Sequence, residues 1–265
     1  METKQKNKLI YLTAPDILTP HCFTTRYGGV STGVCESMNI GTHRPDKWEN
    51  VLKNYHILEE AVGFDVQKLV LTHQTHTDIV RVVTEKDWGT GLFAPEFSDC
   101  DGLITNTPGT GLVIFSADCT PILLWDAVTG AVGAAHAGWR GTAARIGAKA
   151  VEKMVTELGC DPQNIRAAIG PSIGQCCFET DDNVPNAMRE TFGEAAESYI
   201  RKAGEKYYVN LKGLNALSLQ GAGVRQIDIS EECTKCQPDK YWSARITGGN
   251  RGSQGAIIIC KEVGK

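Results

Sequence analysis

The sequence is poor in histidine and has no long apolar run. Only six of its 265 residues are histidine, and none forms the His-x-His pairs from which a multicopper cluster is built. No apolar stretch approaches the roughly 20 residues that a membrane-spanning helix requires. The N-terminal segment METKQKNKLIYLTAPDI has one short apolar run, Leu9–Leu12, and lacks the features of a signal peptide. We therefore expect a cytoplasmic protein.

Several sequence motifs are also absent. There is no GxxxxGK[ST] loop for ATP, no GxGxxG dinucleotide loop and no GxSxG nucleophile turn. The HExxH helix and the H-x-E…P-C-x-x-C signature of zinc deaminases are missing as well. Any catalytic site in this chain must therefore be formed by residues outside these common motifs.

Charge and composition are those of an ordinary soluble protein. The net charge is −4 and the pI is about 5.9, with 42% hydrophobic and 22% charged residues. Nothing in this balance indicates a nucleic acid or an anionic membrane as partner. No linker, repeat or charge block divides the chain, so we expect a single catalytic domain over residues 1–265 and leave the oligomeric state open.

Ten cysteines are many for a cytoplasmic chain. In a reducing compartment they are free thiols, core residues or metal ligands. Cys233 and Cys236 form a CxxC, but a four-cysteine zinc site of the usual kind needs a second CxxC, which is absent. We expect a structural loop there. Of the adjacent Cys176 and Cys177, we expect one to be packed and the other partly exposed.

The stretch 116–145 carries the clearest chemistry. Two apolar runs, Pro121–Trp125 and Ala131–Ala135, are predicted to form buried strands, with Cys119 just before the first and His136 after the second. A thiol and an imidazole at the ends of neighbouring strands can form part of a metal site on a rigid frame. The alternative is a core cysteine and a core histidine on paired strands.

An anion site is predicted beside this pair. A Gly-Trp-Arg-Gly-Thr turn follows His136, and apolar residues at helical spacing then predict a helix over 141–158. Arg140 and the free backbone N–H groups of the helix start would favour an anion.

A third metal ligand is expected from the loop HQTHTD, which joins two predicted strands in residues 68–83. Either His73 or His76 would complete a set with Cys119 and His136. Three ligands at wide spacing are typical of a catalytic zinc, where water or substrate takes the fourth position. Zinc so held lowers the pKa of a bound water.

Three loops contribute further residues. Arg26 stands just before the turn at Gly28, where a guanidinium can face a ligand. Asn39 is a candidate site residue in the loop SMNIGTH. Asp99 and Asp101 precede a short strand and are expected to be turn formers.

Six stretches, in this order along nearly the whole chain, resemble a known family, the laccase-domain proteins: TTRYGGVS, SMNIG, HQTHTDIV, SADCTPILLWD, AAHAGWRGTAARI and GPSIGQCCFE. Members have been labelled multicopper polyphenol oxidase, purine nucleoside phosphorylase and peptidoglycan editing factor. The resemblance implies a layered α/β (α+β) fold of mixed β-sheets flanked by helices. It also implies phosphorolysis of adenosine, inosine and methylthioadenosine, with some deamination of adenosine.

The same resemblance assigns the zinc ligands to His76, Cys119 and His136. His76 is chosen over His73 because the family's first ligand follows Gln by two residues. The chain departs from the family pattern at Thr77, where Gly is usual, and at YWSARI (241–246), where FFSYRR is usual. No role is therefore carried over to Arg245.

Two other functions remain as alternatives. A copper-dependent polyphenol oxidase would hold copper on the same ligands, with Met38 as the one Met near a motif. A hydrolase that edits peptidoglycan precursors would use Cys119 as nucleophile and His136 as base. A non-enzymatic zinc protein is disfavoured, because structural zinc normally has four protein ligands.

Overall fold

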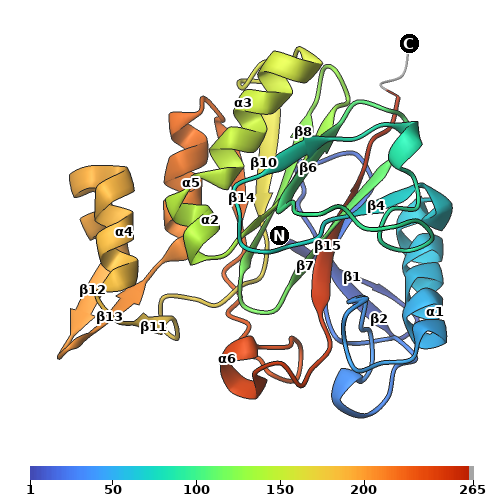
Figure 1. Cartoon of the computed structure of the whole chain (residues 1–265), viewed down its shortest axis with the longest axis horizontal. Coiled ribbons are helices and arrows are strands. Elements are labelled where there is room, and N and C mark those ends of the chain that lie inside the picture. Colours follow the sequence, from blue (N-terminus) through green and yellow to red (C-terminus); the bar gives the residue numbers. More distant parts are fainter. Residues whose placement is uncertain (263–265) are drawn as a thin grey trace.

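Two six-stranded mixed sheets face each other in the computed structural model, which describes residues 1–262 (Figure 1). The first sheet is antiparallel except where β4 pairs with β7. Its strands, in spatial order, are β1 (Glu2–Lys6), β2 (Leu9–Thr13), β3 (His21–Thr24), β15 (Gln254–Ile259), β7 (Gly111–Ser116) and β4 (Leu69–Leu71).

The second sheet holds the centre of the sequence. It is antiparallel except for the outer pairs β10–β14 and β5–β6. Its strands, in spatial order, are β14 (Gln226–Ile229), β10 (Ile165–Ile169), β8 (Thr120–Asp126), β9 (Val132–Ala137), β6 (Gly102–Thr105) and β5 (Val80–Val82).

Helices cover the outer faces of both sheets. α3 (Ile146–Leu158) and α5 (Leu211–Gly221) pack on the second sheet, whereas α1 (Trp48–Leu58) packs on the first. Figure 1 shows α1 on the opposite side of the sheets from α3 and α5. This arrangement confirms the predicted layered α/β fold with mixed sheets flanked by helices.

The strand β8 shows why a continuous apolar run forms here. All seven of its residues are buried. Leu123 and Trp125 pack between the two sheets, while Ile122 and Leu124 pack under the helices. Because side chains alternate between the faces of a strand, a sheet that is covered on both faces needs apolar residues at every position.

A small antiparallel sheet lies at one end of the molecule and packs with α4 and α5 (Figure 1). Its strands are β11 (Glu179–Thr180), β13 (Lys206–Val209) and β12 (Ile200–Ala203). The other helical segments are η1 (Gly33–Cys35), η2 (Glu59–Gly63), η3 (Val66–Lys68), η4 (Glu85–Asp87), α2 (Trp139–Ala143), α4 (Asn183–Phe192), η5 (Gly193–Tyr199) and α6 (Ala244–Thr247). Among residues 1–262, no helix is long and apolar enough to cross a membrane.

The helix predicted over 141–158 is two helices. α2 ends at Ala143 and α3 begins at Ile146, because Arg145 adopts a left-handed conformation with φ of 58°. Apolar periodicity continues across the break, which is why the sequence does not reveal it. The short α2 thereby turns away from α3 and directs Trp139 and Arg140 toward the cavity described below.

This break predicts opposite responses to glycine at two positions. Arg145→Gly should leave the free energy of unfolding unchanged or raise it by up to about 1 kcal/mol, because glycine adopts positive φ without strain. Glu152→Gly, on an exposed position inside α3, should lower it by about 1 kcal/mol. Denaturant unfolding of both variants measures the difference, and equal destabilisation would contradict the break at Arg145.

Candidate functional site

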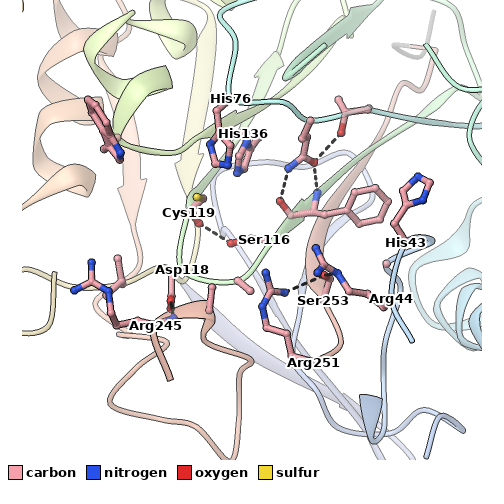
Figure 2. Close-up of a pocket in the computed structure, with 18 of the residues that line it drawn as sticks. His43, Arg44, His76, Ser116, Asp118, Cys119, His136, Arg245, Arg251 and Ser253 are labelled. Carbon is pink, nitrogen blue, oxygen red and sulfur yellow. Dashed lines mark hydrogen bonds between the residues drawn. The ribbon is translucent and has the colours of Figure 1, made fainter. Parts of the chain in front are cut away.

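Strand register brings Cys119 and His136 side by side. β8 and β9 pair with Thr120 opposite Ala137 and Pro121 opposite His136. By the alternation of side chains, residues 119 and 136 point into the space between the sheets, as Leu123 does. Ligand atoms of Cys119, His136 and His76 lie within 4.8 Å of one another, and Figure 2 shows the three side chains converging.

The third member of this set, His76, is held by a buried carboxylate. Asp101 is fully buried and accepts hydrogen bonds from the backbone N–H groups of Thr75, His76 and Thr77, at 3.2, 3.2 and 2.8 Å. The Thr77 hydroxyl donates to the same carboxylate at 2.8 Å. His76 itself has a φ of 64°, so the loop needs this anchor to keep its turn.

Asp101 also orients His136. Nδ1 of His136 donates to Asp101 Oδ1 at 2.8 Å, which leaves Nε2 for a metal. Burial raises the pKa of Asp101, but the hydrogen bonds from His136 and Thr77 lower it below its usual value. Asp101 is therefore an anion with a positioning role, not only the turn former that was expected.

The two imidazoles differ in their protonation. Burial and the neighbouring His136 lower the pKa of His76. Burial also opposes the charge on His136, but the Cys119 sulfur and Asp101 raise the pKa of His136 to about 9. A metal that bound Nε2 would therefore have to displace a proton from His136, which would weaken its binding at acid pH.

The space around the three residues fits a metal ion. A Cβ at Gly138 would lie 2.7 Å from His76 Nδ1 and 3.1 Å from Cys119 Sγ. Glycine at position 138 therefore leaves room for a metal ion between His76, Cys119 and His136, a site that we call the metal cradle. Two imidazole nitrogens and one thiolate suit zinc, and three protein ligands leave one position for substrate or water.

These residues line a cavity of about 760 Å³. Such a volume suits a small organic ligand. Aromatic and aliphatic side chains form part of its wall, namely Phe115, Trp139, Ile173, Phe178 and Leu211. Four arginines also line it, namely Arg44, Arg140, Arg245 and Arg251.

Arg44 and Arg251 converge on one serine (Figure 2). Ser253 Oγ accepts from Arg44 Nε at 2.9 Å and from Arg251 Nη1 at 3.2 Å. Burial, and then the charge of Arg44, lower the pKa of Arg251 to about 10. Within residues 1–262, none of the four cavity arginines forms an ion pair with a carboxylate. Arg251 also donates to the carbonyls of Gly248 and Gly252, at 3.1 and 2.8 Å, so loop contacts fix its position. Two guanidiniums without a carboxylate partner that share a polar anchor are suited to an anion.

The predicted Arg140 lies at the cavity, exposed, with its guanidinium 4.3 Å from the centre of the Trp139 ring. Arg245 lies at the cavity edge near Asp118 (Figure 2), and its Nη1 donates to the Glu179 carbonyl at 2.9 Å. Both arginines can reach an anionic substrate group. Arg44 and Arg251 are additional to the sequence prediction, and they come from loops 207 positions apart (251 − 44).

Two predicted residues lie outside the cavity lining. Arg26 donates to the carbonyls of Glu36 and Pro238, at 2.7 to 3.2 Å, and stacks on Trp242. Because Arg26 lies outside the cavity lining, the structure does not place it at the predicted contact with substrate. Asn39 is fully buried and accepts from the N–H groups of Gly41 and Ser253. It therefore supports the cavity wall through the backbone of Gly41 and Ser253.

His73 is not part of the three-residue cluster. Its Nδ1 donates to the carbonyls of Phe97 and Ser98, at 3.0 and 2.8 Å. It lines the cavity beside His43, with ring centres 6.3 Å apart.

The layered fold and an open His-Cys-His set in a cavity define a metal-associated α/β protein. The family described as "Multi-copper polyphenol oxidoreductase laccase" matches residues 20–261. The chain belongs to this laccase-domain family.

Relatives and solved structures cover nearly the whole chain. "Purine nucleoside phosphorylase YlmD" of Bacillus subtilis is 37% identical over 244 residues, which are 91% of this chain and 88% of the relative. "Adenosine deaminase RL5" of an unknown prokaryotic organism is 34% identical over 87% of this chain and 90% of the relative. The crystal structure of YlmD from Geobacillus stearothermophilus superposes with a TM-score of 0.91 at 35% identity, covering 98% of this chain and 99% of that one. These relatives support an enzyme of this family.

Asparagine variants of Asp101 and of the neighbouring Asp99 should differ in their affinity for zinc. Asp101→Asn should weaken zinc binding by roughly 10- to 100-fold, because an amide cannot accept from every N–H of the His76 loop and still orient His136. Asp99→Asn should change it little, because within residues 1–262 the Asp99 carboxylate accepts only from the exposed Thr75 hydroxyl. Competition with a chromophoric chelator measures both affinities. Equal zinc affinities in the two variants would contradict the role of Asp101.

Proposed function

We propose that the protein is a zinc-dependent purine nucleoside phosphorylase that acts on adenosine, inosine and methylthioadenosine. The observation that carries this proposal is one cavity with a three-ligand metal cradle on one wall and unpaired arginines on another. The names of the relatives support the same reaction. None of the ten cysteines forms a disulfide within residues 1–262, which suits the reducing cytoplasm that we propose as the location of the protein.

His76, Cys119 and His136 would hold the zinc. When bound, zinc supplies a Lewis acid that polarises an oxygen of the substrate or of water. Asp101 keeps His136 in the tautomer that presents Nε2. Binding of zinc by Cys119 would argue against the hydrolase alternative, because a sulfur held by a metal is not free to attack a peptide bond.

Arg44 and Arg251 would hold phosphate. Phosphorolysis builds positive charge on the sugar and negative charge on the leaving purine, so phosphate must be kept beside the anomeric carbon. A guanidinium binds two phosphate oxygens with a planar fork, and two guanidiniums offset the charge of the dianion. Phosphate in turn relieves the repulsion between the two arginines. Arg140 adds positive charge at the exposed edge.

The apolar wall would hold the base. Trp139 and Phe178 line the same cavity as the arginines, and aromatic rings stack on a purine independently of its substituents. This tolerance fits a substrate range that includes both adenosine and inosine.

Deamination of adenosine is a second proposed activity. The open position of the metal cradle can bind water beside a purine, and one relative is named an adenosine deaminase. Deamination would not consume phosphate, which separates it from phosphorolysis.

The positions of the histidines disfavour a multicopper oxidase. His21 is buried and contacts the Thr19 carbonyl, and His56, on the helix α1, contacts the Glu59 carboxylate. A copper cluster requires several histidines at one point, whereas the described part of the chain gathers two of them with Cys119.

Product analysis tests the proposed reaction. Zinc-loaded protein incubated with adenosine and phosphate should give adenine and ribose 1-phosphate. Omitting phosphate should abolish adenine release while any inosine formation continues. Adenosine loss at the same rate without phosphate, with no ribose 1-phosphate, would refute the phosphorylase assignment.

Lysine substitutions test the phosphate site. Arg251→Lys keeps the charge but loses the fork, so it should raise the KM for phosphate by on the order of 10- to 100-fold, as expected for a lost charged hydrogen bond of about 1.5–3 kcal/mol. Arg44→Lys and Arg140→Lys should also raise this KM. Arg26→Lys is the control and should leave it unchanged. Steady-state kinetics with zinc content measured in parallel checks this, and a raised KM for the nucleoside alone would contradict the assignment.

A further inference from the structure

Four cysteines from two distant loops meet on the surface near the cavity. Cys176 and Cys177 follow β10, whereas Cys233 and Cys236 follow β14. Their four sulfur atoms lie within 4.8 Å of one another. We expected a structural loop with two thiols at the CxxC, because the sequence has no second CxxC. The structure places the adjacent Cys176 and Cys177 beside it.

A turn allows both adjacent cysteines to face one point. The N–H groups of Cys177 and Phe178 both donate to the Gly174 carbonyl at 2.9 Å, so the chain at 174–178 is curled and not extended. In a strand, consecutive side chains would point to opposite faces. This curl is a tertiary feature that the sequence pattern alone does not reveal.

The sulfur–sulfur distances match a tetrahedral metal site. Cys236 Sγ lies 3.6 Å from Cys176 Sγ and 3.4 Å from Cys177 Sγ. Four thiolates at about 2.3 Å from a zinc ion are about 3.8 Å apart. A disulfide would require about 2.05 Å. Four thiolates this close repel one another unless a cation lies between them.

The surroundings are built to keep these sulfurs together. The Gly174 N–H donates to Cys233 Sγ at 3.2 Å, and a Cβ at Gly174 would lie 3.1 Å from Cys176 Sγ. The buried Lys212 ammonium donates to the carbonyls of Ser230 and Glu232, just before Cys233. Its positive charge partly offsets the net negative charge of a zinc ion with four thiolates.

We infer that Cys176, Cys177, Cys233 and Cys236 together bind one structural Zn²⁺, separate from the ion held by His76, Cys119 and His136. Four protein ligands close the coordination shell, so this ion supports the structure and does not bind substrate. The inference stands on these four cysteines and does not depend on the proposed reaction.

The site fastens two segments that shape the cavity. The first segment carries Ile173 and Phe178, which line the cavity. In the second, the Thr234 hydroxyl donates to Asp118 Oδ1 at 2.6 Å, next to the ligand Cys119. Loss of the four-cysteine ion should therefore loosen the Phe178 wall and lower thermal stability, while the other ion stays bound.

Metal counting in variants tests the inference. Protein made with zinc and purified under anaerobic, reducing conditions should contain two zinc ions per chain by elemental analysis. Cys119→Ala and Cys236→Ser should each retain one, and the double variant none. Cys160→Ala, at a buried cysteine outside both clusters, is the control and should retain two. A folded Cys119→Ala protein without zinc, or with iron in its place, would overturn the inference.

Cobalt binding gives a second readout that does not require Cys236→Ser to fold. Metal-free Cys119→Ala protein titrated with Co²⁺ should develop the sulfur-to-cobalt charge-transfer and visible bands of a tetrahedral four-thiolate site at one equivalent. Absence of these bands would contradict the inference. A disulfide between Cys236 and either adjacent cysteine, detected by mass spectrometry after rapid alkylation of cells, would contradict it as well and indicate a redox pair.

Discussion

The buried carboxylate of Asp101 is the contact on which the metal cradle depends. It accepts from three consecutive N–H groups of the loop that carries His76 and from Nδ1 of His136. One anion thus fixes two ligands that come from different parts of the chain. A buried carboxylate is costly unless its hydrogen bonds are satisfied. Here the same hydrogen bonds that satisfy it also set the geometry of the site.

The layered fold provides the frame around this contact. β8 and β9 pair so that residues 119 and 136 lie on the same face, directed between the sheets. The loop before β15, in the first sheet, carries Ser253, and the loop before α1 carries Arg44 to the opposite wall. The cluster of His76, Cys119 and His136 and the pair Arg44 and Arg251 therefore face each other because two sheets are packed together (Figure 2).

The sequence predicts the interior of this fold better than its site. Strand β8 was expected within one residue of its observed bounds, because a strand buried on both faces is a continuous apolar run. Strand β9 runs two residues further than expected, so His136 lies within it and not after it. The break at Arg145 was missed, because apolar periodicity continues through it. Helix propensity and apolar spacing do not reveal that a single residue such as Arg145 adopts a left-handed backbone conformation.

Site residues were predictable only where a motif fixes them. Cys119, His136 and Arg140 stand in one short stretch, so the local pairing of β8 with β9 is enough to bring them together. Asp101 looked like a turn former, because its partners at residues 75–77 and 136 are adjacent only after folding. Arg44 and Arg251 were missed for the same reason.

Anomalous diffraction at the zinc edge, from crystals grown with zinc, tests the metal cradle most directly. A peak is expected at about 2.0–2.1 Å from one nitrogen each of His76 and His136 and about 2.3 Å from Cys119 Sγ, with Asp101 on Nδ1 of His136. No peak at this position, or a peak bound by His73 in place of His76, would contradict the cradle described here.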